Sequence, residues 1–542
     1  MTEPVDAPVA APSPSTRLLL FCVLVVATCG LVYELITATM ASYLLGDSVT
    51  QFSLVIGVYL SAMGLGSWLS RFVEHRLVNR FVHVQLIIAV VGGFSAPALF
   101  LGFSVLDDIR PVLFAILIII GTLVGLEIPL LMRLMPGKQQ LKDLVARVLA
   151  FDYIGALLAS IAFPLVLLPW LGLVRTSLLF GSLNAAVALW SARAFVDQLV
   201  RPRLVTAQAL IVLLGTLSCL IVGGEIETFG ERQLYESPVI FSQKTRYQRL
   251  TITRWSDDVR LYIDGNLQFS SADEHRYHES LVHPAFAARE QLASGPARRV
   301  LVLGGGDGLA VRELLRYPGV DRVDLVDLDP EMTRLFRETP ALTELNADSL
   351  ADPRVVVHNA DAMRWLEQQR GGGGGGGGEA GLAPWDIVVI DLPDPNNLSL
   401  GKLYTRAFYR LVRAVLAPDG VAVVQSTSPY LSPRAFWCIV ATLDAADMHP
   451  LPYHAHVPSF GDWGFTLAAR SPLRPPPGLA FELPQPEALR FLSPELVPTL
   501  FAFPADQRPR EVEINRLDTQ MLVNYYDQDL HSFGPLTRRA GS

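Results

Sequence analysis

The sequence predicts an N-terminal polytopic α-helical membrane domain, followed by a small β-lid and a Rossmann-like α/β domain of the doubly wound methyltransferase type. Three observations support this fold class. Hydrophobic residues form 51% of the 542-residue chain and are concentrated before residue 225. Segments 247–255 and 259–268 alternate in polarity as strands do, and a turn is expected between them at Asp257–Asp258. From Val300 to Pro330 the chain reads as strand, glycine turn, helix and strand, which is typical of a nucleotide-binding βαβ unit.

Long apolar runs recur through the first 225 residues. A run of about 20 apolar residues can cross a bilayer as a helix, and no small-residue cleavage site follows the first run. We therefore expect a retained transmembrane domain at 17–224, in the cell (inner) membrane with the lipid bilayer as partner, after a disordered lead at 1–16. About seven spans are expected, near 18–40, 52–70, 81–106, 111–135, 148–171, 173–196 and 204–223.

The basic residues between these runs indicate an orientation. Most Lys and Arg lie in the second, fourth and sixth connections, whereas the other three hold only Arg110 and Arg175. The positive-inside rule then puts the N-terminus in the cytoplasm and, with seven spans, everything after Gly224 outside. A nucleoside cosubstrate would be supplied from inside, so the side on which the catalytic domain lies stays open.

Carboxylates interrupt the apolar runs at Glu34, Glu127 and Asp152. A carboxylate in a membrane is costly and needs a partner or a water-filled path. Two interpretations fit equally well: a route for a substrate or proton, and hydrogen bonding between helices or near the interface.

Charge and cysteine content exclude other classes. The formal net charge of −8 and the lack of a basic stripe argue against a nucleic-acid partner. The four cysteines have neither disulfide-framework nor metal-site spacing. Glu274 and His278 fall four residues apart on one helical face, but a third metal ligand at suitable spacing is missing. No metal site is therefore predicted.

The glycine turn predicts the type of ligand. Gly304 and Gly306, with the glycines beside them, allow a tight turn and close approach to a ligand. Asp327 follows at about 20 residues, where a carboxylate can accept both ribose hydroxyls. Asp307 inside the turn would repel a pyrophosphate. The expected ligand is therefore a nucleoside with a positively charged group.

Later strands end in further carboxylates. Asp361 and Ala362 close one strand, and because ligands lie at the carboxyl ends of the strands, Asp361 is expected to reach the base. Asp391 and Asp394 lie on the loop after the next strand, where two carboxylates can hold an ammonium and accept its proton. Eight glycines at 371–378 predict a surface loop without chemistry.

Taken in order, these motifs resemble the spermidine synthase family of polyamine aminopropyltransferases. The resemblance covers roughly 235–470, and the whole chain resembles the bacterial spermidine-synthase-like proteins with an N-terminal membrane domain. The matching segments are Tyr247–Gln248, Ile263–Gln268, Asp273–Glu279 and Gly304–Gly308. The domains implied are a lid and linking helix at 235–290, an aminopropyltransferase domain at 291–475 and a C-terminal extension of unknown role at 476–542.

The resemblance implies transfer of an aminopropyl group from decarboxylated S-adenosylmethionine, a cosubstrate and not a tightly bound cofactor, to an amine such as putrescine. Asp391 is the implied catalytic residue. The implied donor-binding residues are Gln248, Gly304, Gly306, Asp307, Asp327, Asp361 and Ala362, and the implied polyamine-binding residues are His278, Asp391, Asp394 and Phe460.

The sequence departs from the family at the acceptor side. Phe460 stands where soluble members usually have a tyrosine, and Leu392 and Pro393 replace small polar residues. The acceptor amine therefore stays open. Two other functions also stay open: an S-adenosylmethionine-dependent methyltransferase on the same fold, and a polyamine transporter or sensor whose nucleoside domain does not turn over. A homo-oligomer is compatible with the sequence.

Overall fold

The computed structural model describes residues 16–45, 48–106, 108–134, 141–235, 237–293, 295–371 and 383–532. The chain forms two compact units, one ending at Leu234 and one starting at Tyr235. The predicted disordered lead, apart from Thr16, lies outside the described residues. So does the glycine run, apart from Gly371.

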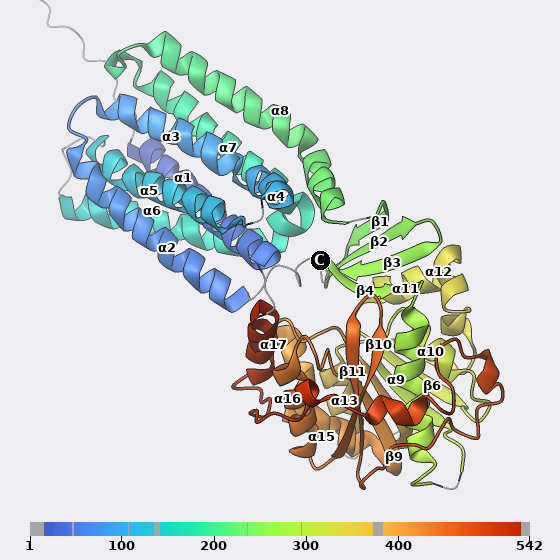
Figure 1. Ribbon diagram of the computed structural model, residues 1–542. Helices are drawn as coiled ribbons and strands as arrows, with labels where there is room; N and C mark the ends of the chain where they lie inside the picture. Colours follow the sequence, from blue (N-terminus) through green and yellow to red (C-terminus); the bar gives the residue numbers. More distant parts are fainter. Residues whose placement is uncertain are drawn as a thin grey trace, which may run out of the picture. The chain divides into compact units, whose positions relative to one another are not determined.

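The first unit is built of long apolar helices (Figure 1). Helix α2 packs along α5, α7 packs along both α3 and α8, and α1 packs along α6. A short 3₁₀ turn at Ser70–Phe72 follows α2. The helices are α1 (Thr16–Leu45), α2 (Ser48–Leu69), α3 (Leu77–Gly93), α4 (Ser95–Val105), α5 (Arg110–Leu134), α6 (Leu141–Ala162), α7 (Leu168–Ala194) and α8 (Pro202–Leu234).

The described residues contain six helical stretches long and apolar enough to cross a membrane, and two of the seven predicted spans, 148–171 and 173–196, fall in one of them. That one is Lys142–Ala194, a single stretch of 53 residues. A π-helical turn at Phe163–Leu167 joins α6 to α7, because Pro164 cannot donate a helical hydrogen bond but the chain turns on without stopping. At 1.5 Å per residue the helices of this stretch add up to roughly 80 Å along the chain, more than twice the thickness of a hydrocarbon core of about 30 Å. Its non-helical break is Gly172, with φ 71°.

The lid consists of four antiparallel strands in the order β1-β2-β3-β4. They are β1 (Val239–Lys244), β2 (Arg249–Trp255), β3 (Asp258–Ile263) and β4 (Asn266–Ser270). The prediction of one strand over 259–268 is wrong, because Asp264 and Gly265 have φ 49° and 82° and form a tight hairpin turn. The first turn also lies one residue earlier than predicted, at Ser256, which has φ 55°.

The main sheet has the strand order β10-β11-β9-β8-β5-β6-β7. Strands β5 to β9 are parallel to one another, and β11 is antiparallel to both of its neighbours, β9 and β10. Strand β5 pairs with β6 on one side and β8 on the other, so the chain reverses direction across the sheet there. Ligands bind at the carboxyl ends of strands at such a point. The strands are β5 (Arg299–Gly304), β6 (Arg322–Asp327), β7 (Val355–Asn359), β8 (Trp385–Asp391), β9 (Leu416–Gln425), β10 (His449–Val457) and β11 (Gly461–Ala469).

Helices flank this sheet and connect its strands (Figure 1). The predicted helix after Asp273 is confirmed as α9, and it precedes the first parallel strand. The helices are α9 (Glu274–Arg289), α10 (Leu309–Leu314), α11 (Pro330–Glu338), α12 (Pro340–Leu345), α13 (Ala362–Gly371), α14 (Leu398–Gly401), α15 (Arg406–Val415), α16 (Pro433–Asp444) and α17 (Met521–Ser532).

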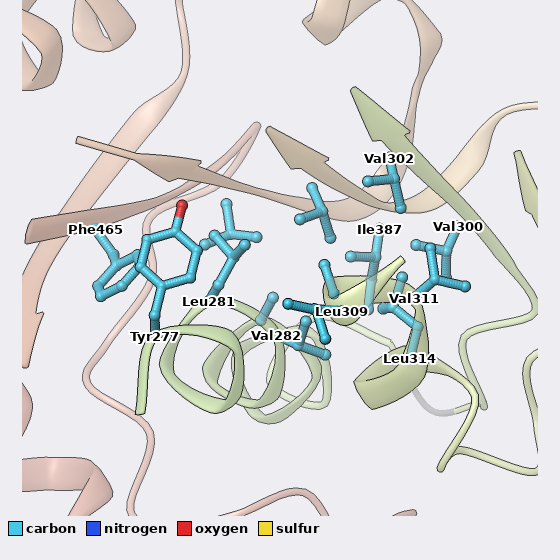
Figure 2. Close-up of a cluster of buried hydrophobic side chains, with 14 of the residues drawn as sticks. Tyr277, Leu281, Val282, Val300, Val302, Leu309, Val311, Leu314, Ile387 and Phe465 are labelled. Atoms are coloured by element: carbon cyan, nitrogen blue, oxygen red, sulfur yellow. The ribbon is translucent and has the colours of Figure 1, made fainter. Parts of the chain in front are cut away.

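The core of the second unit lies between the sheet and helices α9 and α10. Figure 2 shows Leu281 and Val282 of α9 facing Val300, Val302 and Ile387 of the strands. Each of these side chains is fully buried, which contributes about 1.5–3 kcal/mol per side chain. This packing fixes α9 against the sheet and places Tyr277 at the first turn of the helix.

The segment after 476 packs on the α/β unit. Helix α17 lies against α16, and the Arg434 guanidinium donates to the Asp529 carboxylate at 2.6 Å. Asp529 also accepts from the backbone N–H of Arg434 at 2.8 Å. These contacts tie the last described helix to α16.

Candidate active site

The glycine turn lies against the ends of β6 and β8. Gly304 is paired in register with Asp391 and has φ +83°, and a Cβ there would lie 2.0 Å from the Asp391 carbonyl oxygen. The N–H of Gly305 donates to the same oxygen at 3.0 Å. The N–H of Gly306 donates to Oδ2 of Asp327 at 3.1 Å. Glycine is therefore required here to let the turn approach both strand ends.

Three carboxyls surround this turn, of which Asp307 is buried and Asp327 and Asp391 are half-buried. Oδ1 of Asp307 accepts from the N–H of Leu309 at 2.9 Å, and Oδ1 of Asp327 accepts from the N–H of Asp329 at 2.8 Å. Burial raises the pKa of Asp307 to about 6, and the nearby Asp391 carboxylate adds to the rise. Burial likewise raises the pKa of Asp327 to about 7, and Asp307 adds to it. Carboxyls that oppose one another's ionisation in this way favour a cationic ligand.

Asp391 is held by a phenol from α9. The hydroxyl of Tyr277 donates to Oδ1 of Asp391 at 2.6 Å. Burial raises the pKa of Asp391, while the positive charge of His278 and the Tyr277 hydrogen bond oppose that rise. Burial and the neighbouring carboxylate keep the pKa of Tyr277 well above its ordinary value, so the phenol stays a donor. The proton-accepting capacity of Asp391 is thus set by two residues of one helical turn.

The His278 side chain is oriented by Glu274, one helical turn earlier on α9. Its Nδ1 lies 2.8 Å from the Glu274 carbonyl oxygen and 2.8 Å from Glu274 Oε2. Because a carbonyl only accepts, Nδ1 carries the hydrogen, and Nε2 is the nitrogen that titrates. Burial lowers the pKa of His278, but the Glu274 carboxylate outweighs burial and raises it. Arg312 holds Glu274 in turn, at 3.1 and 2.9 Å.

Asp394 is bound from two distant parts of the chain. Its Oδ1 accepts from Gln425 Nε2 at 2.9 Å, and its Oδ2 accepts from the hydroxyl of Tyr526 on α17 at 2.8 Å. Burial raises the pKa of Asp394 to about 6. The hydroxyl of Tyr404 donates to the Pro393 carbonyl at 3.0 Å. The loop after β8 is therefore held on both sides of its second carboxyl.

Asp361 lies at the end of β7 but has a different environment. Lys402 Nζ donates to its Oδ2 at 2.6 Å, and the N–H of Arg364 donates to its Oδ1 at 3.1 Å. Burial alone would raise the pKa of Asp361, but the hydrogen bond from Lys402 and the Arg364 amide lower it. Ala362 is buried and begins α13. Asp361 is thus an ion-paired carboxylate, unlike Asp307, Asp327 and Asp391.

Gln248 lies in the turn before β2. Its carbonyl accepts from the N–H of Thr245 at 2.8 Å, and the Thr245 hydroxyl donates to Oδ2 of Asp329 at 2.7 Å. This hydroxyl anchors the lid turn two residues from Asp327. Gln243 on β1 also donates to Glu331 at 3.0 Å. Hydrogen bonds therefore join the lid to residues just after β6, the strand that ends with the predicted ribose-binding residue Asp327.

Aromatic rings lie beside Asp391. The rings of Tyr277 and Phe460 have centroids 6.4 Å apart, and Phe460 lies 5.0 Å from Trp463. Phe460 therefore lies near Tyr277, the residue that donates to Asp391. Within the described residues, no group of three or more His, Cys, Asp and Glu side chains is placed to hold a metal ion.

Some partners of these residues are absent from the sequence prediction. Tyr277 lies inside the quoted Asp273–Glu279 motif, beside His278, and that adjacency was the available signal. Lys402 and Tyr526 carry no local signal, because their carboxylates lie 41 and 132 residues away in sequence.

The strand order, with the glycine turn after β5, defines a Rossmann-like α/β domain whose strand ends carry carboxyls. Residues 274–475 match the family model described as "Spermine/spermidine synthase domain". The chain is 48% identical to polyamine aminopropyltransferase 1 of Ralstonia nicotianae, over 98% of this chain and 99% of that protein. It is 46% identical to the polyamine aminopropyltransferase of Leptospira interrogans, over 94% of this chain and 97% of that one.

A solved structure, the spermidine synthase of Thermotoga maritima, is 22% identical with a TM-score of 0.39, covering 54% of this chain and 87% of that chain. From its near full-length likeness to the curated proteins, the chain belongs to the polyamine aminopropyltransferase family. It is an enzyme that transfers aminopropyl groups.

Proposed function

We propose that the donor is decarboxylated S-adenosylmethionine, that the acceptor is a small amine such as putrescine, and that the helical unit spans the cell membrane. The observation that carries the proposal is the group of buried and half-buried carboxyls around the glycine turn, Asp307, Asp327 and Asp391. The pKa of Asp307 is raised to about 6 and that of Asp327 to about 7. Such a group suits a ligand that brings both a nucleoside and positive charge.

The donor would lie along the glycine turn. Gly304 and Gly306 would allow its close approach, and Asp327 would accept the ribose hydroxyls. Asp307 would pair with the ammonium of the aminopropyl group, and the carboxylate of ordinary S-adenosylmethionine would be repelled there. This selects against methyl transfer. Gln248, Asp361 and Ala362 would complete the donor site around the base.

The reaction needs a neutral amine, because a protonated amine has no free electron pair. Asp391 would bind the acceptor ammonium and take its proton. The amine nitrogen then attacks the aminopropyl carbon bonded to sulfur, a carbon–nitrogen bond forms, and the carbon–sulfur bond breaks with its pair on sulfur. A neutral thioether leaves. Alignment of the nitrogen with this bond supplies much of the rate.

The acceptor would be held by His278, Asp394 and Phe460 with Asp391. Asp394 supplies a second carboxyl for the distal ammonium, and the Phe460 ring lines the methylene chain. Leu392 and Pro393 make this side more apolar than in soluble members. The panel of test amines should therefore include acceptors whose chain is longer or more apolar than that of putrescine.

The membrane location rests on the apolar stretches of the helical unit. Reporter fusions after residue 532 would show on which side the catalytic unit lies. If Lys142–Ala194 crosses the membrane once, the catalytic unit lies on the same side as the N-terminus. If that stretch crosses twice, it lies on the opposite side.

The direct test is product analysis by mass spectrometry, with full-length protein in detergent, the decarboxylated donor and a panel of amines. Asp391→Asn should lower kcat by about 10²–10⁴-fold while donor binding is retained, because it removes the general base. The control is Asp518→Asn, which changes an exposed aspartate shortly before α17 and should keep full activity. Methyl transfer from S-adenosylmethionine as the sole reaction would refute the assignment.

A further inference from the structure

A second polar group lies inside the helical unit. Glu127 on α5 and Gln85 on α3 are both fully buried, and Gln85 Nε2 donates to Glu127 Oε1 at 2.6 Å. Asn184 on α7 is buried as well, and its Nδ2 donates to the hydroxyl oxygen of Tyr33 on α1 at 2.9 Å. Four helices thus contribute one polar side chain each to their common interior.

The packing of α3 on α7 brings the two amides together. Ser177 donates to the carbonyl of Gly93 at 2.9 Å, and Gly181 lies against the backbone of Ala89. The two helices therefore run antiparallel, and one further turn places Asn184 beside Gln85.

The remaining members of the group, Tyr33 and Glu34, lie on α1 and are close to Tyr59 of α2. The ring of Tyr33 lies against Gly92 of α3, and Glu127 is close enough to Tyr33 and Tyr59 to act on both electrostatically. Glu34, the residue after Tyr33, is also buried and acts on Tyr59. We call Tyr33, Glu34, Gln85, Glu127 and Asn184 the bundle cluster.

Two acceptors of the bundle cluster have no partner. The amide oxygens of Gln85 and Asn184 are buried and accept no hydrogen bond. The helix backbones cannot supply one, because interior N–H groups are already bonded to carbonyls four residues earlier. Buried polar atoms are rarely left in this state, so each such atom needs an explanation, of which a missing donor is one.

The charge of the bundle cluster identifies the donor. It has two carboxyl groups, and neither forms an ion pair in the part of the chain that the structure describes. Amide and carboxylate oxygens that converge without a cation match a primary ammonium, which carries three N–H donors on one compact charge.

We propose that the bundle cluster binds the protonated amino group of a small alkylamine, at a site separate from the catalytic carboxyls. The choice of an amine over a metal cation rests on the proposed function, since the same chain handles amines. Gln85, Asn184 and Glu127 would each accept one hydrogen bond from the ammonium, and Glu34 would add a second negative charge nearby.

The test is equilibrium dialysis of the full-length protein in lipid nanodiscs with radiolabelled putrescine, without donor. The wild type should bind two amines per chain, one at each site. Glu127→Gln should weaken one of them by about tenfold or more, because it removes a charge-assisted hydrogen bond, and should keep transferase activity within about twofold. Asn184→Leu provides a second variant that removes an unpartnered acceptor and should weaken the same site.

The matched control is Asp152→Asn, a carboxylate of α6 in the same unit that lies outside the bundle cluster. It should leave both sites intact. One amine per wild-type chain, unchanged binding in both cluster variants, or occupation by Na⁺ in preference to putrescine would overturn the proposal. Failure of the catalytic assignment is distinguishable, because Asp391→Asn would then keep its activity whatever the helical unit binds.

Discussion

Buried carboxyls lie in both units, but their surroundings differ. In the α/β unit, Asp307 and Asp327 accept from backbone amides, and Asp391 accepts from a tyrosine. In the helical unit, Glu127 accepts from Gln85, whose own amide oxygen has no partner. One group is closely supported and the other is supported only in part.

The backbone accounts for this difference. A strand end and a glycine turn leave N–H groups that can reach a carboxylate, whereas the interior of an α-helix has already used its own. A site in a helical bundle must therefore be built from side chains alone. The number of its contacts is smaller, and each side chain carries more of the specificity.

The largest expected effect separates two glutamates. Glu274→Gln should lower the free energy of unfolding by about 3 kcal/mol, because it breaks a buried ion pair with Arg312 and the contact to His278. Glu127→Gln should leave stability unchanged or higher, since it replaces an unpaired buried carboxylate with an amide. Thermal unfolding of the purified full-length variants measures both. Equal losses would erase the contrast between the units.

The glycine turn gives the next effect. Gly304→Ala should lower activity by about 10²-fold, because the added methyl displaces the Asp391 backbone. Gly265→Ala has nearly the same φ, +82° against +83°, but open space around its Cβ. It should therefore share the backbone strain and keep the activity. Steady-state rates of both variants distinguish collision from strain, and similar losses would show that strain alone dominates.

The Tyr277 hydroxyl should control the pH profile. Asp391 acts as a base when ionised, so activity rises as pH rises through its pKa, and the Tyr277 hydrogen bond holds that pKa down. Tyr277→Phe should therefore move the acidic limb of the kcat profile to higher pH and lower kcat by about tenfold, as expected for a charge-assisted hydrogen bond. An unmoved acidic limb with lower kcat would reduce Tyr277 to a packing residue.

The smallest effect concerns the C-terminal helix. Tyr526→Phe should raise KM for the amine about fivefold, because Asp394 loses one of its side-chain donors. Its neighbour provides the control, since the Tyr525 hydroxyl accepts from the backbone of Glu513 and touches neither carboxylate. Tyr525→Phe should leave KM within about twofold. If both variants raise KM alike, α17 acts through general packing.

The parallel core of the fold was predictable from the sequence because its signals are local. The turn at Gly304 and the carboxylates closing their strands occupy adjacent stretches, and the structure brings Asp307, Asp327 and Asp391 together as the doubly wound order requires. The Asp264–Gly265 hairpin was also signalled locally, but the alternation on both sides of it was interpreted as one strand.

The rest depended on contacts between distant residues. Lys402 pairs with Asp361 and Tyr526 reaches Asp394, although each lies on a separate element. The two predicted spans 148–171 and 173–196 lie in one apolar stretch, Lys142–Ala194, and the predicted boundary between them falls at the non-helical residue Gly172. A sequence pattern does not distinguish a bend from a stop.

The two partners of the hydrogen bond from Tyr526 to Asp394 are synthesised at different times, because they lie 132 residues apart in the chain. A ribosome that has translated as far as β9 has already made every predicted donor-binding residue, but not the phenol that holds the acceptor carboxyl. The Asp394 carboxyl is therefore made well before the hydroxyl that donates to it. This contact can form only after the last described helix, α17, has been synthesised, long after the helical unit.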